Sequence, residues 1–331
     1  MDAQLKANMV RSLWFAFLLL PAGLVFLLAT AGSARAQEGA MSGKGKEVDA
    51  YLQHVFKTRK GVDVDSIRRK WLDIPYATLS PAQKLDIYLP ETGDGPFPVV
   101  IAIHGGSFTA GDKRDFQVAP MLAALDRGYA VVSINYRLTG EALFPAQIND
   151  VKAAIRWARA NAAKYDLRPD RIALWGDSAG GNLASLAGVT GGTGELEDKS
   201  LGNGGQSCAV AAVVDWYGPI DFLTMGDPQR LAEKGNKLIG KTTLEAPQLY
   251  RDASPESHIH PGIPPILIQH GDADRVIAVS QSVHFAEALR QGAGAGSVTL
   301  DILKGADHLD EQFTTPENTG RVLDFLDAHM Q

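Results

Sequence analysis

Short apolar runs alternate with helix-like segments over most of this chain, and this alternation restricts the fold more than any other feature of the sequence. Several runs are continuously apolar and rich in β-branched residues, as a parallel strand buried on both faces requires. Between them lie segments with helical spacing of apolar residues, such as residues 150–165, 280–291 and 318–330. This alternation predicts a doubly wound α/β sheet in one domain. The predicted strands are KLDIYL, PVVIAIHG, YAVVSINYRL, RIALWG, AVAAVVDWYG, PPILIQHG and VTLDILKG.

The first helix-like segment carries a candidate cap at its start. Val151, Ile155 and Ala158 fall on one helical face, and Asp150 precedes them. An aspartate at this place can accept hydrogen bonds from the free N–H groups of the first turn. We therefore predict that Asp150 is the N-cap of this helix.

The N-terminus is typical of an export signal. Lys6 and Arg11 precede an apolar stretch, and Ala34 and Ala36 fit the small-x-small pattern of a secretory cleavage site. Residues 1–36 are therefore predicted to be a signal peptide that is cleaved after Ala36, which makes the protein secreted or periplasmic. The apolar stretch would also suit a membrane anchor if it were not cleaved.

The rest of the chain divides into an extension and a main domain. Residues 37–70 are predicted to form an N-terminal extension that is partly flexible or helical, and residues 71–331 to form the α/β domain. Two segments interrupt the alternation. Residues 188–208 form a glycine-rich insertion, and residues 222–258 form either a cap over a site or a long connection between two strands.

Charge and cysteine content exclude some classes of function. The formal net charge of −6 argues against nucleic acid as a partner. Cys208 is the only cysteine, so the chain has neither an intrachain disulfide nor a cysteine-rich zinc site. Because Cys208 opens an apolar run, we expect it to be a small buried residue rather than a reactive thiol.

The stretch RIALWGDSAGGN contains the pattern G-x-S-x-G around Ser178. In a strained turn between a strand and a helix, this pattern exposes the serine as a nucleophile, and an apolar strand does precede it here while a helix-like segment follows. The N–H of Ala179 can then point at a developing oxyanion. The other interpretation is an ordinary glycine-rich turn that happens to contain a hydroxyl group.

A second glycine-rich loop follows a strand in IAIHGGSFTAGDK. Acyl transfer needs a second N–H donor for the tetrahedral intermediate, and glycine lets the backbone come close to it. The amides of Gly106 and Ser107 are the predicted donors, with Gly105 close by. His104 is expected to brace the loop rather than to act as a base.

A carboxylate and an imidazole follow the last two predicted strands. The base needs a carboxylate that holds its tautomer, and Asp272 and Asp274 both lie in a loop after a strand. We favour Asp274, because it lies later in the loop and has more reach, and expect Asp272 to brace the loop. His270 is expected to be structural. Of the eight histidines, only His308 follows the final strand after this acid, so it is the predicted base.

At these residues the chain resembles an α/β-hydrolase carboxylesterase of the branch related to hormone-sensitive lipase, and within it the feruloyl-esterase-like and acetylesterase-like carbohydrate esterases. The resemblance is carried over residues 71–331 by HGGSFTAGDK, NYRL, GDSAGG, HGDADRVIAVSQS and GADH. It implies an α/β-hydrolase fold, with a mostly parallel, eight-stranded, doubly wound sheet and a small cap or insertion. The implied triad is Ser178, Asp274 and His308. The residues implied around the oxyanion hole are Gly105, Gly106, Ser107 and Ala179.

Two residues depart from the pattern of that family. Ser107 stands where many relatives have a third glycine, but a backbone donor survives this change. Asp307 stands beside the predicted base, where a glycine is often seen, and its effect on the imidazole is left open.

Together these features predict a serine esterase that needs no metal and no organic cofactor. The expected substrates are short-chain or aromatic esters of the acetyl or feruloyl type, either small molecules or linked to polysaccharide. Aromatic side chains that could contact such esters are Phe108, Trp175, Trp216 and Tyr217, although a core position is favoured for Trp175. The alternatives are a generalist short-chain esterase, a serine peptidase of the same fold and a non-catalytic binding protein.

Overall fold

The computed structural model describes residues 47–48 and 50–330. The chain divides into two compact units, Met1–Lys57 and Thr58–Gln331. In the first unit, residues 47–48 and 50–57 are helical, and the predicted signal peptide lies outside the described residues. None of the helices in the described part of the chain combines the length and the apolar character needed to cross a lipid bilayer.

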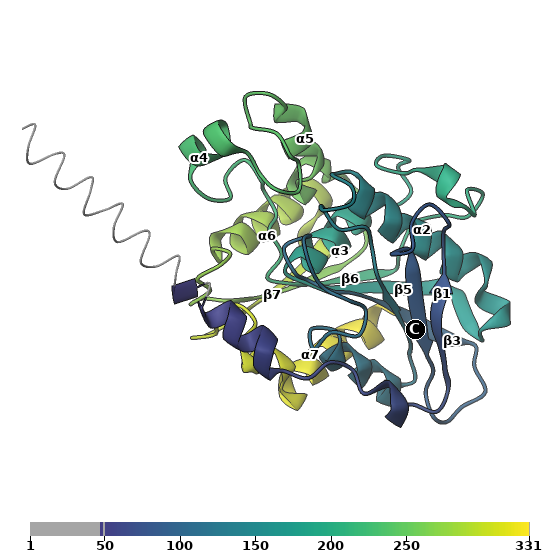
Figure 1. Ribbon diagram of the computed structural model, residues 1–331. Coiled ribbons are helices and arrows are strands. Elements are labelled where there is room, and N and C mark those ends of the chain that lie inside the picture. Colours follow the sequence, from purple (N-terminus) through teal and green to yellow (C-terminus); the bar gives the residue numbers. More distant parts are fainter. Residues whose placement is uncertain (1–46, 49, 331) are drawn as a thin grey trace, which may run out of the picture. The chain divides into compact units, whose positions relative to one another are not determined.

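The second unit is built on an eight-stranded sheet with the order β1-β2-β4-β3-β5-β6-β7-β8 (Figure 1). The pairs β1/β2 and β2/β4 are antiparallel, and all other pairs are parallel. The predicted mostly parallel sheet is therefore confirmed, and each of the seven predicted runs overlaps one strand. The strands are β1 (Lys70–Pro75), β2 (Lys84–Tyr88), β3 (Phe97–Ile103), β4 (Ala130–Ile134), β5 (Leu167–Asp177), β6 (Ala212–Trp216), β7 (Ile266–Gly271) and β8 (Val298–Leu303).

Helices cover both faces of this sheet. Figure 1 shows α2, α3 and α6 on one face and α7 on the other. The α-helices are α2 (Ala146–Ala160), α3 (Ala179–Val189), α4 (Pro228–Lys234), α5 (Pro247–Asp252), α6 (Ser280–Ala293) and α7 (Pro316–Met330). The 3₁₀ segments are η1 (Val64–Ser66), η2 (Ala119–Arg127), η3 (Ala162–Lys164), η4 (Lys199–Leu201), η5 (Pro255–His258), η6 (Ala295–Ser297) and η7 (Glu311–Thr314).

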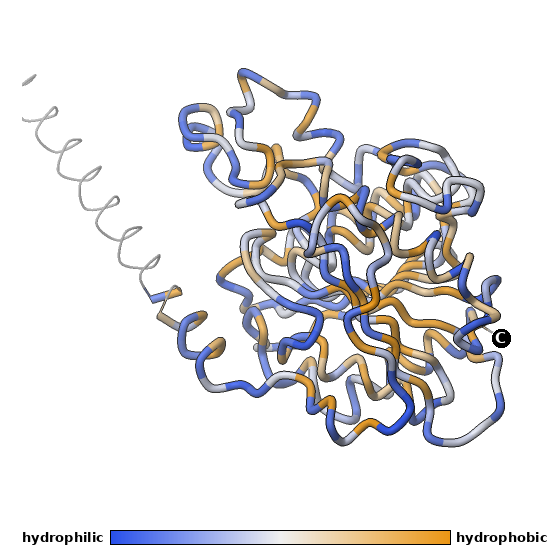
Figure 2. Tube along the Cα trace, turned by 45° about the vertical axis from the view of Figure 1, so that its right-hand side comes forward, coloured by the Kyte–Doolittle hydropathy of each residue, from blue (hydrophilic) through white to orange (hydrophobic). Residues whose placement is uncertain are grey.

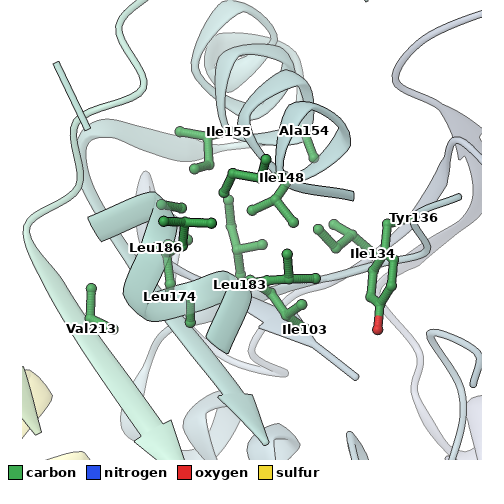
Figure 3. Close-up of a cluster of buried hydrophobic side chains, with 14 of the residues drawn as sticks. Ile103, Ile134, Tyr136, Ile148, Ala154, Ile155, Leu174, Leu183, Leu186 and Val213 are labelled. Atoms are coloured by element: carbon green, nitrogen blue, oxygen red, sulfur yellow. The ribbon is translucent and has the colours of Figure 1, made fainter. Parts of the chain in front are cut away.

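The core lies between the sheet and the helices. Hydrophobic residues follow the strands, whereas the outer turns are mostly hydrophilic (Figure 2). Figure 3 shows Ile155 of α2 and Leu186 of α3 in the same buried cluster as Leu174 of β5 and Val213 of β6. Since these strands are buried on both faces, they are continuously apolar in sequence. Cys208 is also buried, as predicted.

The predicted N-cap role of Asp150 is wrong. Helix α2 begins at Ala146, after Pro145, so Asp150 lies in its second turn. There the fully buried carboxylate accepts hydrogen bonds from the guanidinium group of Arg137, at 2.7 to 3.1 Å, and from the side-chain amide of Gln83, at 2.7 Å. The aspartate therefore links the start of the helix to the neighbouring loops. It lies at this position because it forms a buried ion pair, and not because it caps the helix.

The two insertions are anchored in different ways. Residues 188–208 follow α3 and are held by two buried cations of α2. The Lys152 ammonium donates to the carbonyl oxygen of Thr190 at 3.0 Å, and the Arg156 guanidinium donates to that of Asp198 at 2.8 Å. Burial lowers the pKa of Lys152 to about 8. The insertion thus packs onto the helix layer.

Residues 222–258 contain α4, α5 and η5. The segment is attached at its start to α6, because the Gln281 side-chain oxygen accepts the N–H groups of Ile220 and Asp221 at 3.0 and 2.7 Å. The Ser254 hydroxyl oxygen also accepts the N–H of Phe222 at 3.0 Å. Both ends of the segment are therefore tied down beside the carboxyl ends of the central strands.

Candidate active site

Ser178 lies in a strained turn between β5 and α3. Its backbone has φ 50° and ψ −118°, a conformation that non-glycine residues rarely adopt. A Cβ atom on Gly176 would lie 2.1 Å from the carbonyl oxygen of Gly180, and a Cβ on Gly180 would lie 2.1 Å from that of Ile103. The turn can therefore form only with glycine on either side, which is the physical reason for the G-x-S-x-G spacing.

The three residues predicted as a triad lie in one hydrogen-bonded series. His308 follows β8, and its Nε2 lies 3.0 Å from Ser178 Oγ. The other ring nitrogen, Nδ1, lies 2.8 Å from Asp274 Oδ2. Because a carboxylate can only accept, Nδ1 carries the proton and Nε2 is free to accept the serine hydroxyl proton. Only 3% of the His308 surface and 8% of the Ser178 surface is exposed, so little water competes for these contacts.

Asp274 is held in its ionised form. Its Oδ1 accepts the N–H groups of Val276 and Ile277, both at 2.8 Å, and its Oδ2 contacts two imidazoles, those of His308 and His270. Burial alone raises the pKa of Asp274, but the hydrogen bonds from His270 and His308 outweigh it, and the pKa lies well below its usual range. The carboxylate is thus negatively charged at any pH at which the imidazole could act as a base.

His270 and Asp272, which were predicted to be structural, form hydrogen bonds that hold the loops around the site. His270 is fully buried, with Nδ1 2.7 Å from Ser282 Oγ and Nε2 3.0 Å from the carbonyl oxygen of Ile277. Asp272 accepts the N–H of Gly305 at 2.5 Å and so joins its loop to the loop that carries the predicted base. Both residues support the site from outside.

Asp307 does not pair with the imidazole beside it. Its Oδ2 accepts the Arg275 guanidinium at 2.6 Å, and its Oδ1 accepts the backbone N–H of His308 at 2.8 Å and that of Arg275 at 2.9 Å. The carboxylate therefore joins the loop of His308 to the loop of Asp274. The effect of Asp307, where a glycine is often seen in the family, is therefore to hold these two loops together and not to pair with the imidazole.

The predicted oxyanion donors differ in whether their amides are free. In the described part of the chain, the N–H groups of Gly106, Ser107 and Ala179 donate no hydrogen bond. Ser107 and Ala179 line the same cavity as Ser178. The Gly105 N–H, in contrast, donates to Asp177 Oδ1 at 2.9 Å. Gly105, which was predicted to lie close to the donors, therefore does not offer its own amide to the oxyanion, because this N–H already has a buried acceptor.

Asp177 is a residue of the site that the sequence analysis missed. It precedes the predicted nucleophile, and its fully buried carboxylate accepts the Gly105 N–H and, at 2.6 Å, the side-chain amide of Gln117. Burial raises its pKa to about 6, although these hydrogen bonds act in the opposite direction. The sequence feature that could have revealed its role is a carboxylate at the end of an otherwise apolar strand, because a buried carboxylate needs hydrogen-bond partners.

His104 braces the oxyanion loop. Its ring stacks on Tyr136 with centroids 4.5 Å apart, and its Nδ1 lies 2.8 Å from the carbonyl oxygen of Gly105. The Tyr136 hydroxyl donates to the His104 carbonyl oxygen at 2.9 Å. Burial lowers the pKa of His104 to about 4, so the ring is neutral at pH 7 and is only a weak base.

Two of these buried groups have opposite effects on stability between pH 6.5 and pH 4. The pKa of His104 is lowered on folding, so the unfolded chain binds its proton first and the stability from this group is lost as the pH falls. The pKa of Asp177 is raised on folding, so the folded chain binds that proton first and gains stability as the pH falls. We expect the free energy of unfolding of Asp177→Asn to decrease more steeply than that of the unsubstituted protein between pH 6.5 and pH 4. Urea unfolding at a series of pH values checks this, and parallel curves would contradict it.

A cavity of about 560 Å³ opens beside Ser178. One wall consists of the two predicted oxyanion elements, a second of residues 224–238, and a third of residues 274–281. Of the four aromatic side chains considered from the sequence, Phe108 lines this cavity. Trp175 and Trp216 are in the core instead, in edge-on contact with centroids 5.0 Å apart.

The last of these aromatic residues, Tyr217, is also buried, with its ring 4.7 Å from the imidazole of His308. It therefore packs against the predicted base rather than lining the cavity. Among the described residues, no group of three or more histidine, cysteine, aspartate or glutamate side chains is placed to hold a metal ion.

The strand order, the strained turn after β5 and the chain order of serine, aspartate and histidine define the α/β-hydrolase fold. Within that class, the chain belongs to the BD-FAE family, whose model matches residues 85–289. The predicted resemblance is therefore confirmed.

Several known proteins are similar to this chain. Esterase LipQ of Mycobacterium tuberculosis is 34% identical over 71% of this chain and 56% of its own length. The probable carboxylic ester hydrolase LipM of the same organism is 36% identical over 66% of this chain and 51% of its own length. The chain thus spans little more than half the length of these curated relatives.

Among solved structures, a truncated form of a carbohydrate esterase from gut microbiota is 34% identical, with a TM-score of 0.72, over 82% of this chain and 99% of that one. Esterase 2 of Thermogutta terrifontis in its apo form is 22% identical, with a TM-score of 0.66, over 80% of this chain and 96% of that one. The second likeness shows the fold alone.

Proposed function

We propose that this protein is a serine carboxylesterase that hydrolyses short-chain or aromatic esters of the acetyl or feruloyl type. The observation that carries the proposal is the series Ser178 Oγ, His308 and Asp274, with contacts of 3.0 and 2.8 Å. The names of the similar proteins, esterase and carbohydrate esterase, support the same reaction and an ester linked to sugar.

In the proposed first step, Ser178 Oγ attacks the ester carbonyl carbon while His308 Nε2 takes the hydroxyl proton. The carbonyl oxygen becomes an oxyanion, which accepts hydrogen bonds from the backbone N–H groups of Gly106, Ser107 and Ala179. Each such donor is worth roughly 3–4 kcal/mol in the transition state. The tetrahedral intermediate then breaks its bond to the alcohol oxygen, which receives the proton from His308, and an acyl-enzyme remains.

In the second step, a water molecule attacks the acyl carbon and gives a proton to His308 Nε2. Collapse of this intermediate releases the carboxylic acid, and the proton returns to Ser178 Oγ. Asp274 stays ionised throughout and stabilises the imidazolium that forms in each step. We also propose that residues 1–36 are removed as a signal peptide, which makes the mature enzyme secreted or periplasmic.

Labelling with a fluorophosphonate tests the proposal directly. The probe should attach to Ser178 and to no other serine, as mapped by mass spectrometry of the digested protein, and labelling should abolish hydrolysis of 4-nitrophenyl acetate. A panel of 4-nitrophenyl esters of increasing acyl length, methyl ferulate and acetylated xylan then ranks the substrates. An unlabelled Ser178 in folded protein would favour a non-catalytic binding protein instead.

A further inference from the structure

The wall of the cavity formed by residues 224–238 carries two cations. Arg230 of α4 and Lys237, which follows that helix, both line the cavity and are exposed. Among the described residues, neither side chain has a carboxylate within ion-pair distance. Two unpaired cations in one cavity stand out in a chain with a net charge of −6.

The other charged side chains of this cavity already have partners. Asp227 accepts the backbone N–H groups of Gln229 and Arg230, at 2.8 and 3.1 Å, and so caps α4. Arg275 is paired with Asp307, and Asp274 is bound by two imidazoles. Asp227 keeps its negative charge, so Arg230 and Lys237 are the cations of this cavity that have no carboxylate partner among the described residues.

Much of the remaining lining is apolar. Phe108, Phe222, Leu231, Leu238 and Ile277 all contribute to it. An apolar chamber suits a short or aromatic acyl group, whereas exposed cations suit an anion that stays partly in water. The two environments lie in one cavity, so a single substrate can use both.

We propose that the preferred substrates are esters that carry a carboxylate, with the ester group at Ser178 and the carboxylate at Arg230 and Lys237. This inference rests on the proposed esterase function and narrows its substrate class. The guanidinium group can bind a carboxylate through two parallel hydrogen bonds, and the ammonium group adds a second charge. The carboxylate belongs either to the acyl part or to the alcohol part, as in a uronic acid near an acetylated sugar.

Matched substrate pairs test the proposal in the purified full-length protein. For the alcohol side, 4-acetoxybenzoate is compared with 4-acetoxybenzamide. For the acyl side, mono-4-nitrophenyl succinate is compared with its methyl ester. The quantity measured is the ratio of kcat/KM for the anionic ester to kcat/KM for the neutral one, in the unsubstituted protein and in the double variant Arg230→Gln/Lys237→Gln. Lys234→Gln is the control, because it removes a cation from the same helix outside the cavity.

We expect the double variant to lower this ratio roughly fivefold in at least one pair, because kcat/KM for the anionic ester should fall more than kcat/KM for the neutral ester. The control should leave the ratio as it is, and 0.5 M salt should lower the ratio in the unsubstituted protein but not in the double variant. A ratio that the double variant does not change in either pair overturns this proposal while the esterase function stands. If neither neutral nor anionic esters are hydrolysed, the proposed function itself fails.

Discussion

Replacement of Ser178 by alanine is expected to lower kcat/KM for 4-nitrophenyl acetate by about 10⁴- to 10⁶-fold. The Ser178 hydroxyl lies 3.0 Å from His308 Nε2, so its loss removes the nucleophile and the proton that the base takes from it. The residual rate then reflects binding and the oxyanion donors alone. Steady-state kinetics of the purified variant measure the effect.

The control is Ser280→Ala, because Ser280 also lines the cavity but its hydroxyl is hydrogen-bonded to no imidazole of the described residues. This variant should retain activity within about threefold, since surface substitutions away from the reacting groups usually have small effects. Circular dichroism and the thermal unfolding midpoint of both variants show whether they fold. A folded Ser178→Ala protein with more than a trace of activity would disprove the proposed nucleophile.

Replacement of Asp274 by asparagine should have the second largest effect, a decrease in kcat of about 10⁴-fold. The substitution removes the negative charge that stabilises the imidazolium. It also places an amide group where His308 Nδ1–H and His270 both approach a single oxygen, at 2.8 and 3.2 Å. The imidazole can then adopt the tautomer in which Nε2 carries the proton, and this nitrogen no longer accepts from the serine. The effect should be largest on kcat, with little change in KM.

Asp272→Asn is the matched control, since it changes the same side chain in the same loop, two residues away. Among the described residues, its carboxylate accepts a hydrogen bond from the Gly305 N–H alone, so we expect kcat within about threefold of the unsubstituted enzyme and a small loss of stability. If Asp272→Asn lost more activity than Asp274→Asn, the assignment of the acid would have to be exchanged. Unfolding in urea separates the loss of activity from a loss of folded protein.

The central strands could be predicted because a strand that is buried on both faces is continuously apolar in sequence. β1 was missed because it is an edge strand in which half-buried and exposed residues alternate along Lys70–Pro75. Its pairing with β2 is interrupted between Trp71 and Ile74, and Asp73 lies there at φ 56°. Such a strand has one neighbour and a bulge, so it lacks both a continuous apolar run and a regular period.

The site was predictable where residues follow the ends of parallel strands, because those ends meet at one edge of the sheet. Ser178, Asp274 and His308 were found in this way. The contact between Gly105 and Asp177 could not be predicted. It joins residues 72 positions apart through a backbone amide, and the order of side chains in the sequence does not show where a backbone amide points. The start of α2 was misplaced for a related reason, since an aspartate at a cap and an aspartate in a buried ion pair are identical in sequence.

The hydrogen bond from Gly105 to Asp177 has a consequence for how the protein can accommodate different esters. It joins the turn of the nucleophile to the oxyanion loop at a point that water does not reach, so these two parts of the cavity must shift together or not at all. Within the described part of the chain, no hydrogen bond joins the wall formed by residues 224–238 to either of them. Room for a bulkier acyl or sugar group must therefore come from that wall, and substitutions there should alter substrate range while the bond-breaking groups keep their alignment.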